Sequence, residues 1–460
     1  MLDEQLEEQI AQWRSFLRTR QTIHAVDVAE LEDHLREQIA ELSAAGLAAD
    51  EAFLVAVKRL GDLDALSREF AREHSDRLWK QLIAPADAEG STPGVRRDAV
   101  VAFGLAVAAA VAIKVPALFG MQLDQDAGFY FRNLGLFVLP LLAGYFAWKR
   151  QLDSRTLWWL AVAFVGAGVF ANVYPFRAHD PASPTHDPGN TELLTGLHLP
   201  IALWVVMGLA YAGARWGDVS GRMDFIRFSG ELFIYYALIA LGGGVLTGLM
   251  AMLFESIGVD VESFLTSWWL PCGAAGAVLI GSWLVEAKQS VIENMAPVLA
   301  RLFTPLFTIV LLVFLGAVLA TGRGLDLQRE VLIVFDLLLV VVLGLLLYSI
   351  SARDPRAPAG PFDWLQLVLV LSALLADLVA LWAIAERISE FGFTPNRTAA
   401  LGMNLILLVN LAWSAVLALR FLRGRGAFAD LERWQTNYLP VYAVWAAVVV
   451  IVFPPVFGFI

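Results

Sequence analysis

Eleven apolar runs, each about 20 residues long, constrain this chain more than any other feature, because a helix of that length crosses a bilayer. The hydrocarbon core is ~30 Å thick and an α-helix rises 1.5 Å per residue. The chain is 58% hydrophobic and only 17% charged. The sequence therefore predicts an all-α, polytopic helical membrane protein with about eleven spans. The runs lie near residues 98–118, 130–148, 156–175, 194–214, 230–254, 262–285, 303–321, 330–350, 364–385, 399–419 and 439–459.

The first 83 residues have a different pattern, which predicts a small soluble helical bundle. Leu6 and Ile10 begin one apolar stripe at helical spacing, and Leu35, Ile39 and Leu42 form the inner face of a second helix. The division that follows is a helical domain at 1–83, a Pro/Gly/Ser-containing linker at 84–97 and a transmembrane domain at 98–460.

The charge of the chain is concentrated at its start, since residues 1–90 hold nineteen acidic against ten basic side chains. An acidic head argues against nucleic acid as a partner. It leaves the lipid bilayer and a cytoplasmic regulatory protein, bound through residues 1–83, as the expected partners. The basic residues also favour one orientation, because basic loops stay in the cytoplasm. Sixteen of them flank the predicted inner ends of the spans and six the outer ends. This predicts a cytoplasmic N-terminus and an outer C-terminus.

Two resemblances add to these patterns. The run VAELEDHLREQIAELSAAGLAADEAFLVAVKRLGDLDALSREF resembles the permease prefix domain, a helical module of signalling type found ahead of bacterial membrane regions. The segments FYFRNLGLFVLPLLAGYFAWKR, ERISEFGFTPNR and YLPVYAVWAAVVVIVFPPVFGF resemble a bacterial polytopic family labelled domain of unknown function four-one-five-three. This second resemblance implies a location in the bacterial inner membrane, and it implies no reaction.

Ionisable residues inside apolar runs are costly and therefore mark candidate functional sites. The predicted topology places Lys114, His198, Asp336 and Asp377 in the outer half of the membrane. A lysine and two carboxylates at one depth favour a shared polar site, in which Asp377 is the leading candidate. The alternative is that Lys114 extends outward to the interface while each aspartate meets a local partner. The stretch from Ser372 to Asn404 surrounds Asp377 and contains a predicted charged loop.

The outer ends of the spans carry a further set of polar residues that we interpret as a candidate rim of this site. The rim is predicted to contain Arg132, Asn133, Glu386, Arg387, Asn396 and Arg397. The alternative, which is slightly favoured, is a structural role in which the loop residues pair with one another and hold two helices together.

Three functions are compatible with these features. The first is the handling of a solute or ion, as in a transporter, through the outer polar site. The second is a membrane sensor that signals through the helical head. The third is an enzyme, since His179 and His186 in an outer loop are residue types that bind zinc. It is the least favoured, because these residues have no recognised ligand spacing. No nucleotide-binding loop or nucleophile motif occurs, and no cofactor is indicated.

Overall fold

The computed structural model describes residues 6–7, 10, 25–44, 47, 52–53, 55–56, 93–123, 125–177, 188–287, 295–321, 329–355 and 357–460. The chain divides into two compact units, Met1–Thr92 and Pro93–Ile460. Their boundary falls inside the predicted linker. Within the described ranges every regular element is helical and no strand occurs, which confirms the all-α class.

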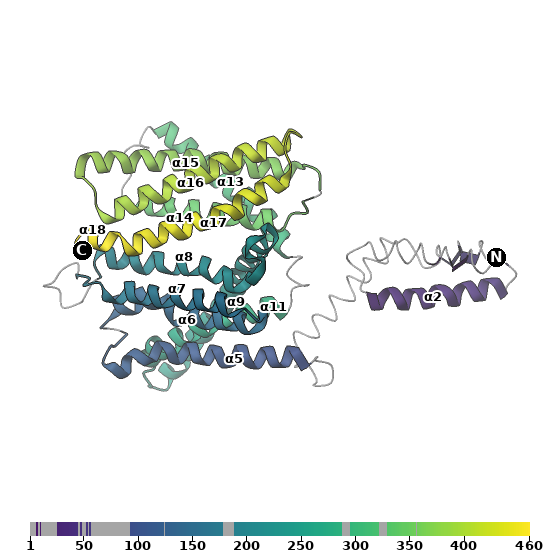
Figure 1. The fold of residues 1–460 in the computed structure, drawn as a ribbon, viewed down its shortest axis with the longest axis horizontal. Helices are drawn as coiled ribbons and strands as arrows, with labels where there is room; N and C mark the ends of the chain where they lie inside the picture. Colours follow the sequence, from purple (N-terminus) through teal and green to yellow (C-terminus); the bar gives the residue numbers. More distant parts are fainter. Residues whose placement is uncertain are drawn as a thin grey trace. The chain divides into compact units, whose positions relative to one another are not determined.

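The second unit consists of long helices that overlap all eleven predicted apolar runs (Figure 1). They are α5 (Pro93–Lys114), α6 (Ala127–Arg150), α7 (Ser154–Val173), α8 (Asn190–Ala212), α9 (Val219–Ser256), α11 (Leu270–Ala287), α13 (Met295–Thr321), α14 (Arg329–Ser351), α15 (Pro361–Phe391), α16 (Pro395–Leu422) and α17 (Phe428–Ile451). Short elements extend some of them: η1 (Val115–Phe119), η2 (Gly213–Gly217), α10 (Glu262–Phe264), the π-helical η3 (Leu265–Trp269) and α18 (Phe453–Val456).

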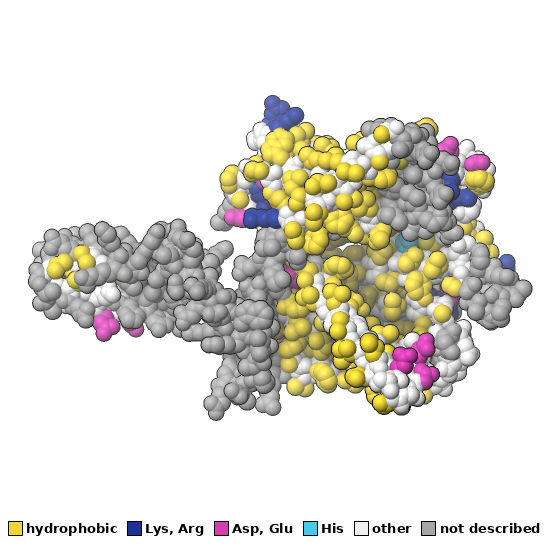
Figure 2. Space-filling view, turned by 180° about the vertical axis from the view of Figure 1, so that it is seen from behind, with side chains coloured by type: hydrophobic (Ala, Val, Ile, Leu, Met, Phe, Trp, Pro, Cys, Tyr) yellow, Lys and Arg dark blue, Asp and Glu magenta, His cyan; other side chains and the backbone are white. Residues whose placement is uncertain are grey.

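Among the described residues, nine of these helical stretches are long and apolar enough to cross a bilayer. The two long helices outside this set are α14, whose described apolar part is shorter, and α17, which begins with polar residues. Large apolar side chains cover the outside of the unit, and Figure 2 shows them as a broad band with charged side chains towards its two ends. Such a surface is stable only against hydrocarbon. The protein is therefore a multi-pass membrane protein.

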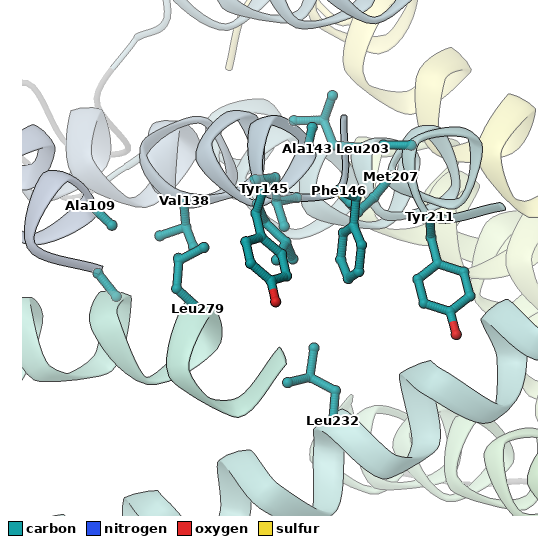
Figure 3. Close-up of a cluster of buried hydrophobic side chains, with 14 of the residues drawn as sticks. Ala109, Val138, Ala143, Tyr145, Phe146, Leu203, Met207, Tyr211, Leu232 and Leu279 are labelled. Atoms are coloured by element: carbon teal, nitrogen blue, oxygen red, sulfur yellow. The ribbon is translucent and has the colours of Figure 1, made fainter. Parts of the chain in front are cut away.

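Two apolar cores hold the membrane unit together. The first joins α5 to α9 with α11, and its centre is a group of aromatic and aliphatic side chains that includes Tyr145, Phe146 and Tyr211 (Figure 3). Phe146 packs edge-on against both Tyr211 and Phe228, at ring-centroid distances of 5.2 and 5.3 Å. The second core joins α13 to α17 with the beginning of α9. Contacts of α8 with α17, and of α9 with both α11 and α14, connect the two halves.

The structure corrects two details of the sequence analysis. Glu386 and Arg387 were predicted to lie in a loop, but α15 continues to Phe391, and only residues 392–394 separate it from α16. Gly392, with φ +76°, ends α15 because a glycine adopts this left-handed conformation without strain. Asn396 and Arg397 lie in the first turn of α16.

The first unit is described only in part. Its helix α2 (Ala25–Ala44) buries Leu35, Ile39 and Leu42 against Ile10, in a cluster that Ala52 and Ala56 complete. On the outside, Arg36 donates to Glu7 Oε2 at 2.8 Å and to Glu32 Oε1 at 3.0 Å. Both hydrogen bonds raise the pKa of Arg36, and the one to Glu7 has the larger effect.

Candidate functional site

The candidate site lies where α14, α15 and α16 pack together in the second core. These helices bring Asp336, Asp377 and Asn404 into one apolar bundle. Local sequence fixes where two of the helices begin. Asp363 caps α15 by accepting the backbone N–H of Gly360 at 2.7 Å, and Thr394 caps α16 by accepting that of Arg397 at 3.4 Å.

The two carboxylates of the site have different surroundings. Asn404 Nδ2 donates to Asp336 Oδ1 at 2.8 Å and to the carbonyl of Ala400 at 3.0 Å. Asp377 is fully buried, and neither of its oxygens accepts a hydrogen bond from any described residue. The side-chain oxygen of Asn404 is also buried without a partner there. Asp336 and Asp377 are close enough to interact electrostatically.

An uncompensated carboxylate in an apolar interior is costly unless a cation or a proton accompanies it. The wall around Asp377 supplies neither, since Ala373, Ala376 and Ala380 are all fully buried neighbours on α15. Oxygen atoms without partners are the ligand type that hard cations prefer, and a carboxylate also accepts a proton directly. The arrangement can therefore bind a small cation or a proton between α14, α15 and α16.

The structure separates Lys114 and His198 from the two carboxylates. Lys114, at the end of α5, donates to the carbonyl of Ser267, and its ammonium group lies 4.4 Å from the centre of the Trp268 ring. His198 on α8 is buried, with Nδ1 at 2.9 Å from the carbonyl oxygen of Leu194. The single shared site of four residues is therefore not formed. The four residues have similar predicted depths, but they lie on helices in different parts of the bundle.

Several of the predicted rim residues tie helix ends together. Arg132 on α6 forms an ion pair with Glu192 on α8. Asn133 and Asn172 donate to each other at 2.9 and 2.8 Å, and thereby link α6 to α7. Asn396 donates to Asn190 Oδ1 at 2.7 Å, which links α16 to α8.

The remaining rim residues lie on the α15–α16 hairpin. Arg397 donates to the carbonyl of Gly392 at 2.9 Å, and its guanidinium lies 5.4 Å from the Phe391 ring centre. Glu386 is exposed and Arg387 is half-buried, both on the last turns of α15. These contacts stabilise the hairpin itself and place none of the six rim residues on Asp377.

The predicted metal ligands His179 and His186 lie outside the described residues, so the enzyme interpretation stays a prediction. Within the described ranges no three His, Cys, Asp or Glu side chains are grouped in a way that could hold a metal ion.

Sequence reasoning assigned no role to two groups that the structure makes prominent. One is Asn404. Its polar amide inside an apolar run could have marked it as a candidate from the sequence alone. The other is a buried network of Asn410, Ser414 and Gln435, with exposures of 0, 1 and 1%. Gln435 lies in the polar start of α17, which is continuous with the apolar part of the same helix and buries one face.

Searches of protein-family models, curated proteins and solved structures gave no match to this chain. The two family resemblances accordingly stay predictions.

Proposed function

We propose that this protein is a transporter-like handler of a small cation in the bacterial inner membrane, with Asp377 as its ion-binding group. One observation carries the proposal: Asp377 is fully buried among apolar residues, and its two oxygens have no hydrogen-bond partner among the described residues. A purely structural carboxylate gains its stability from hydrogen bonds or an ion pair. Asp377 has neither with any residue that the structure describes, and a cation or proton is the partner that its chemistry requires.

Asp336 and Asn404 complete the site in this proposal. Asn404 holds Asp336 in place through the 2.8 Å hydrogen bond, so that a second negative charge faces Asp377. Two carboxylates at one position increase the attraction for a cation. Neutralising either carboxylate weakens this attraction. A proton or cation bound to one aspartate therefore changes how strongly the other aspartate binds its own.

Flux into proteoliposomes tests the function. The purified protein is reconstituted, and proton entry is followed with a trapped pH-sensitive dye while sodium entry is followed with radioactive sodium. Asp377→Asn should abolish the flux that the wild type shows. The matched control is Asp430→Asn on α17, because Asp430 is a half-exposed carboxylate that forms a surface ion pair with Arg433 at 3.6 Å. Wild-type flux in folded Asp377→Asn protein would refute the proposal, and so would the absence of both fluxes in the wild type.

We further propose that the N-terminus is cytoplasmic, which the distribution of basic residues supports. Protease treatment of right-side-out and inside-out vesicles tests this orientation, because only inside-out vesicles should lose the head.

The alternative function, signalling through the head, draws support from the division of the chain at Thr92 and from the separate apolar cluster around Leu35. In this proposal the head binds a cytoplasmic regulatory protein. Crosslinking in cells compares the full chain with a chain that lacks residues 1–90. A partner that crosslinks only to the full chain supports signalling, and identical partners for both chains contradict it.

A further inference from the structure

One face of α15 connects Asp377 with the opposite end of the bundle. Asp363, Gln366, Val370 and Asp377 follow one another at spacings of three, four and seven residues. At 3.6 residues per turn these positions lie on one side of the helix, within an arc of roughly 60°. The distance along the axis from Asp363 to Asp377 is about 21 Å at 1.5 Å per residue. This face is turned towards α14 and α16, as the hydrogen bonds and the cavity below show.

A small, partly enclosed cavity lies against this face, between α14, α15, α16 and α17. Its volume is about 20 Å³, and its polar lining comes from Asp363, Gln366 and Ser414, with Val370 and other apolar side chains around them. A cavity holds a water molecule when it offers roughly 10–15 Å³ and two to four polar partners. This one satisfies both conditions. A hydrated metal cation is too large for it.

Beyond the cavity, a buried network extends along α16 and α17. Gln435 Nε2 donates to Ser414 Oγ at 2.6 Å and to Asn410 Oδ1 at 3.0 Å, while Asn410 Nδ2 donates to Gln435 Oε1 at 3.1 Å. The helices α15 and α16 are antiparallel, and Val370 and Ser414 line the same cavity. Asn410, one turn from Ser414, therefore lies at a level between Val370 and Asp377.

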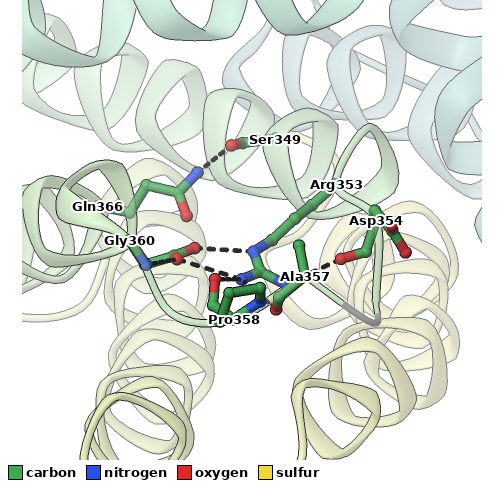
Figure 4. Close-up of polar contacts among 8 residues, drawn as sticks. Ser349, Arg353, Asp354, Ala357, Pro358, Gly360 and Gln366 are labelled. Atoms are coloured by element: carbon green, nitrogen blue, oxygen red, sulfur yellow. Dashed lines mark hydrogen bonds and ion pairs between the residues drawn. The ribbon is translucent and has the colours of Figure 1, made fainter.

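An ion pair closes the other end of the cavity. Arg353 donates to Asp363 through Nε at 2.9 Å and through Nη2 at 3.2 Å (Figure 4). The same guanidinium donates to the carbonyls of Asp354, Ala357 and Pro358, each at 3.0 Å. Its centre lies 4.8 Å from the Phe421 ring and 4.5 Å from the Phe428 ring, and both rings line the cavity. Asp363, the three carbonyls and the two rings therefore hold the guanidinium at this end of the cavity, and the carboxylate neutralises its charge.

We propose that α14 to α17 form a water-lined route by which a proton reaches Asp377 from the Arg353 end of the bundle. The inference rests on the proposed function and specifies its ion, because a chain of single waters carries protons and has no room for a hydrated metal cation. Each transfer moves one proton from a water to the lone pair of the next oxygen, and the last one converts the Asp377 carboxylate into a neutral carboxylic acid. Ser414 offers its remaining lone pair to a water in the cavity, and Asn410 and Gln435 hold the Ser414 hydroxyl in position.

The route is closed at two places in this structure. The Arg353–Asp363 ion pair closes the end, and the fully buried Ala373 and Leu411 close the segment between the cavity and Asp377. Proton entry therefore requires the ion pair to separate and the helices to part around Ala373. Replacing Asp363 with asparagine removes the charge that holds Arg353 over the cavity.

Hydrogen exchange at a cysteine thiol tests the route without any measurement of flux. The only native cysteine, Cys272, is first replaced by alanine, and Val370→Cys is compared with Leu369→Cys. Both positions are 2% exposed, but only Val370 lines the cavity. A thiol that no water reaches keeps its hydrogen, so in D₂O the S–H of Val370→Cys should exchange for S–D at least about tenfold faster than that of Leu369→Cys. The exchange is followed by the S–H stretching band in the infrared spectrum.

Adding Asp363→Asn to Val370→Cys should increase the rate further, while the same addition to Leu369→Cys should leave it unchanged. Equal exchange rates at the two positions would overturn the route. Flux measurements distinguish a failure of the proton route from a failure of the proposed cation function. Sodium entry without proton entry overturns the proton assignment and leaves the proposed cation function standing. Proton entry that persists in Gln435→Leu protein overturns the role of the Asn410–Gln435 network.

Discussion

Asn404 on α16 donates its side-chain amide to Asp336 on α14 at 2.8 Å, and this hydrogen bond makes the two carboxylates of the site unequal. Asp336 is held by a neutral donor, whereas Asp377 on α15 has no hydrogen bond from the described residues. We therefore assign different roles to the two carboxylates. Asp336 is held in place as a fixed negative charge near Asp377, and Asp377 is free to bind a proton or cation and release it.

Asn404→Ala should destabilise the protein by about 1–3 kcal/mol, because it removes a donor from a partly buried carboxylate. The loss is measured as a lower unfolding temperature in detergent. Leu405→Ala is the matched control, since Leu405 is the next residue of α16 and is 53% exposed on the lipid-facing surface. An Asn404→Ala protein as stable as the control variant would show that the bond to Asp336 contributes nothing.

Asp377→Asn should raise the unfolding temperature while it abolishes flux. The substitution removes a buried charge that no described group compensates, and sites that bind ligands are often destabilising for this reason. Each kcal/mol gained corresponds to roughly 2–4 °C in a domain of 150–250 residues, with a smaller shift in a longer chain. Asp430→Asn, on the surface, should change stability by less than about 0.5 kcal/mol. A lower unfolding temperature for Asp377→Asn would mean that this carboxylate has a stabilising partner after all.

The spans were predictable because the bilayer imposes a simple requirement on length and hydropathy, and helices occur at all eleven runs. The same requirement predicts the depth of a residue within its span. Its position around the bundle was not predictable, because this depends on which helices pack together. Lys114 and Asp377 therefore share a predicted depth, yet the ammonium of Lys114 meets Ser267 and Trp268 in the other half of the unit.

Polar side chains at helix starts were the least predictable feature. Gln435 follows a charged stretch typical of membrane surfaces, and the sequence contains no sign that α16 would cover it. In the structure Gln435 forms hydrogen bonds with Asn410 and Ser414, which are four residues apart on one face of α16. The pairing satisfies all three groups, and this makes their burial possible.

Gly402→Ala should destabilise the contact between α16 and α17. A methyl group at this position would overlap the ring of Trp445, so the indole must move within a packed interface. Overpacking of this kind costs about 1–3 kcal/mol. Gly144→Ala on α6 is the opposite case, because no atom lies within 4 Å of the added methyl group. Alanine should there stabilise the helix by up to about 1 kcal/mol. Equal effects of the two substitutions on the unfolding temperature would contradict the close approach at Gly402.

The ion pair between Arg132 and Glu192 provides the last prediction. Both side chains are largely buried, with 17 and 10% of their surfaces exposed, and the carboxylate also packs against the backbone of Gly128. Glu192→Gln should cost about 3–5 kcal/mol, because it leaves the charge of Arg132 uncompensated inside the protein. Arg132→Met combined with Glu192→Gln should recover much of this loss, because the buried charge is then gone. The unfolding temperatures of the four proteins form a double-mutant cycle, from which the interaction energy is obtained. If the losses of the two single variants simply add in the double variant, the residues act independently and the ion pair does not hold α6 to α8.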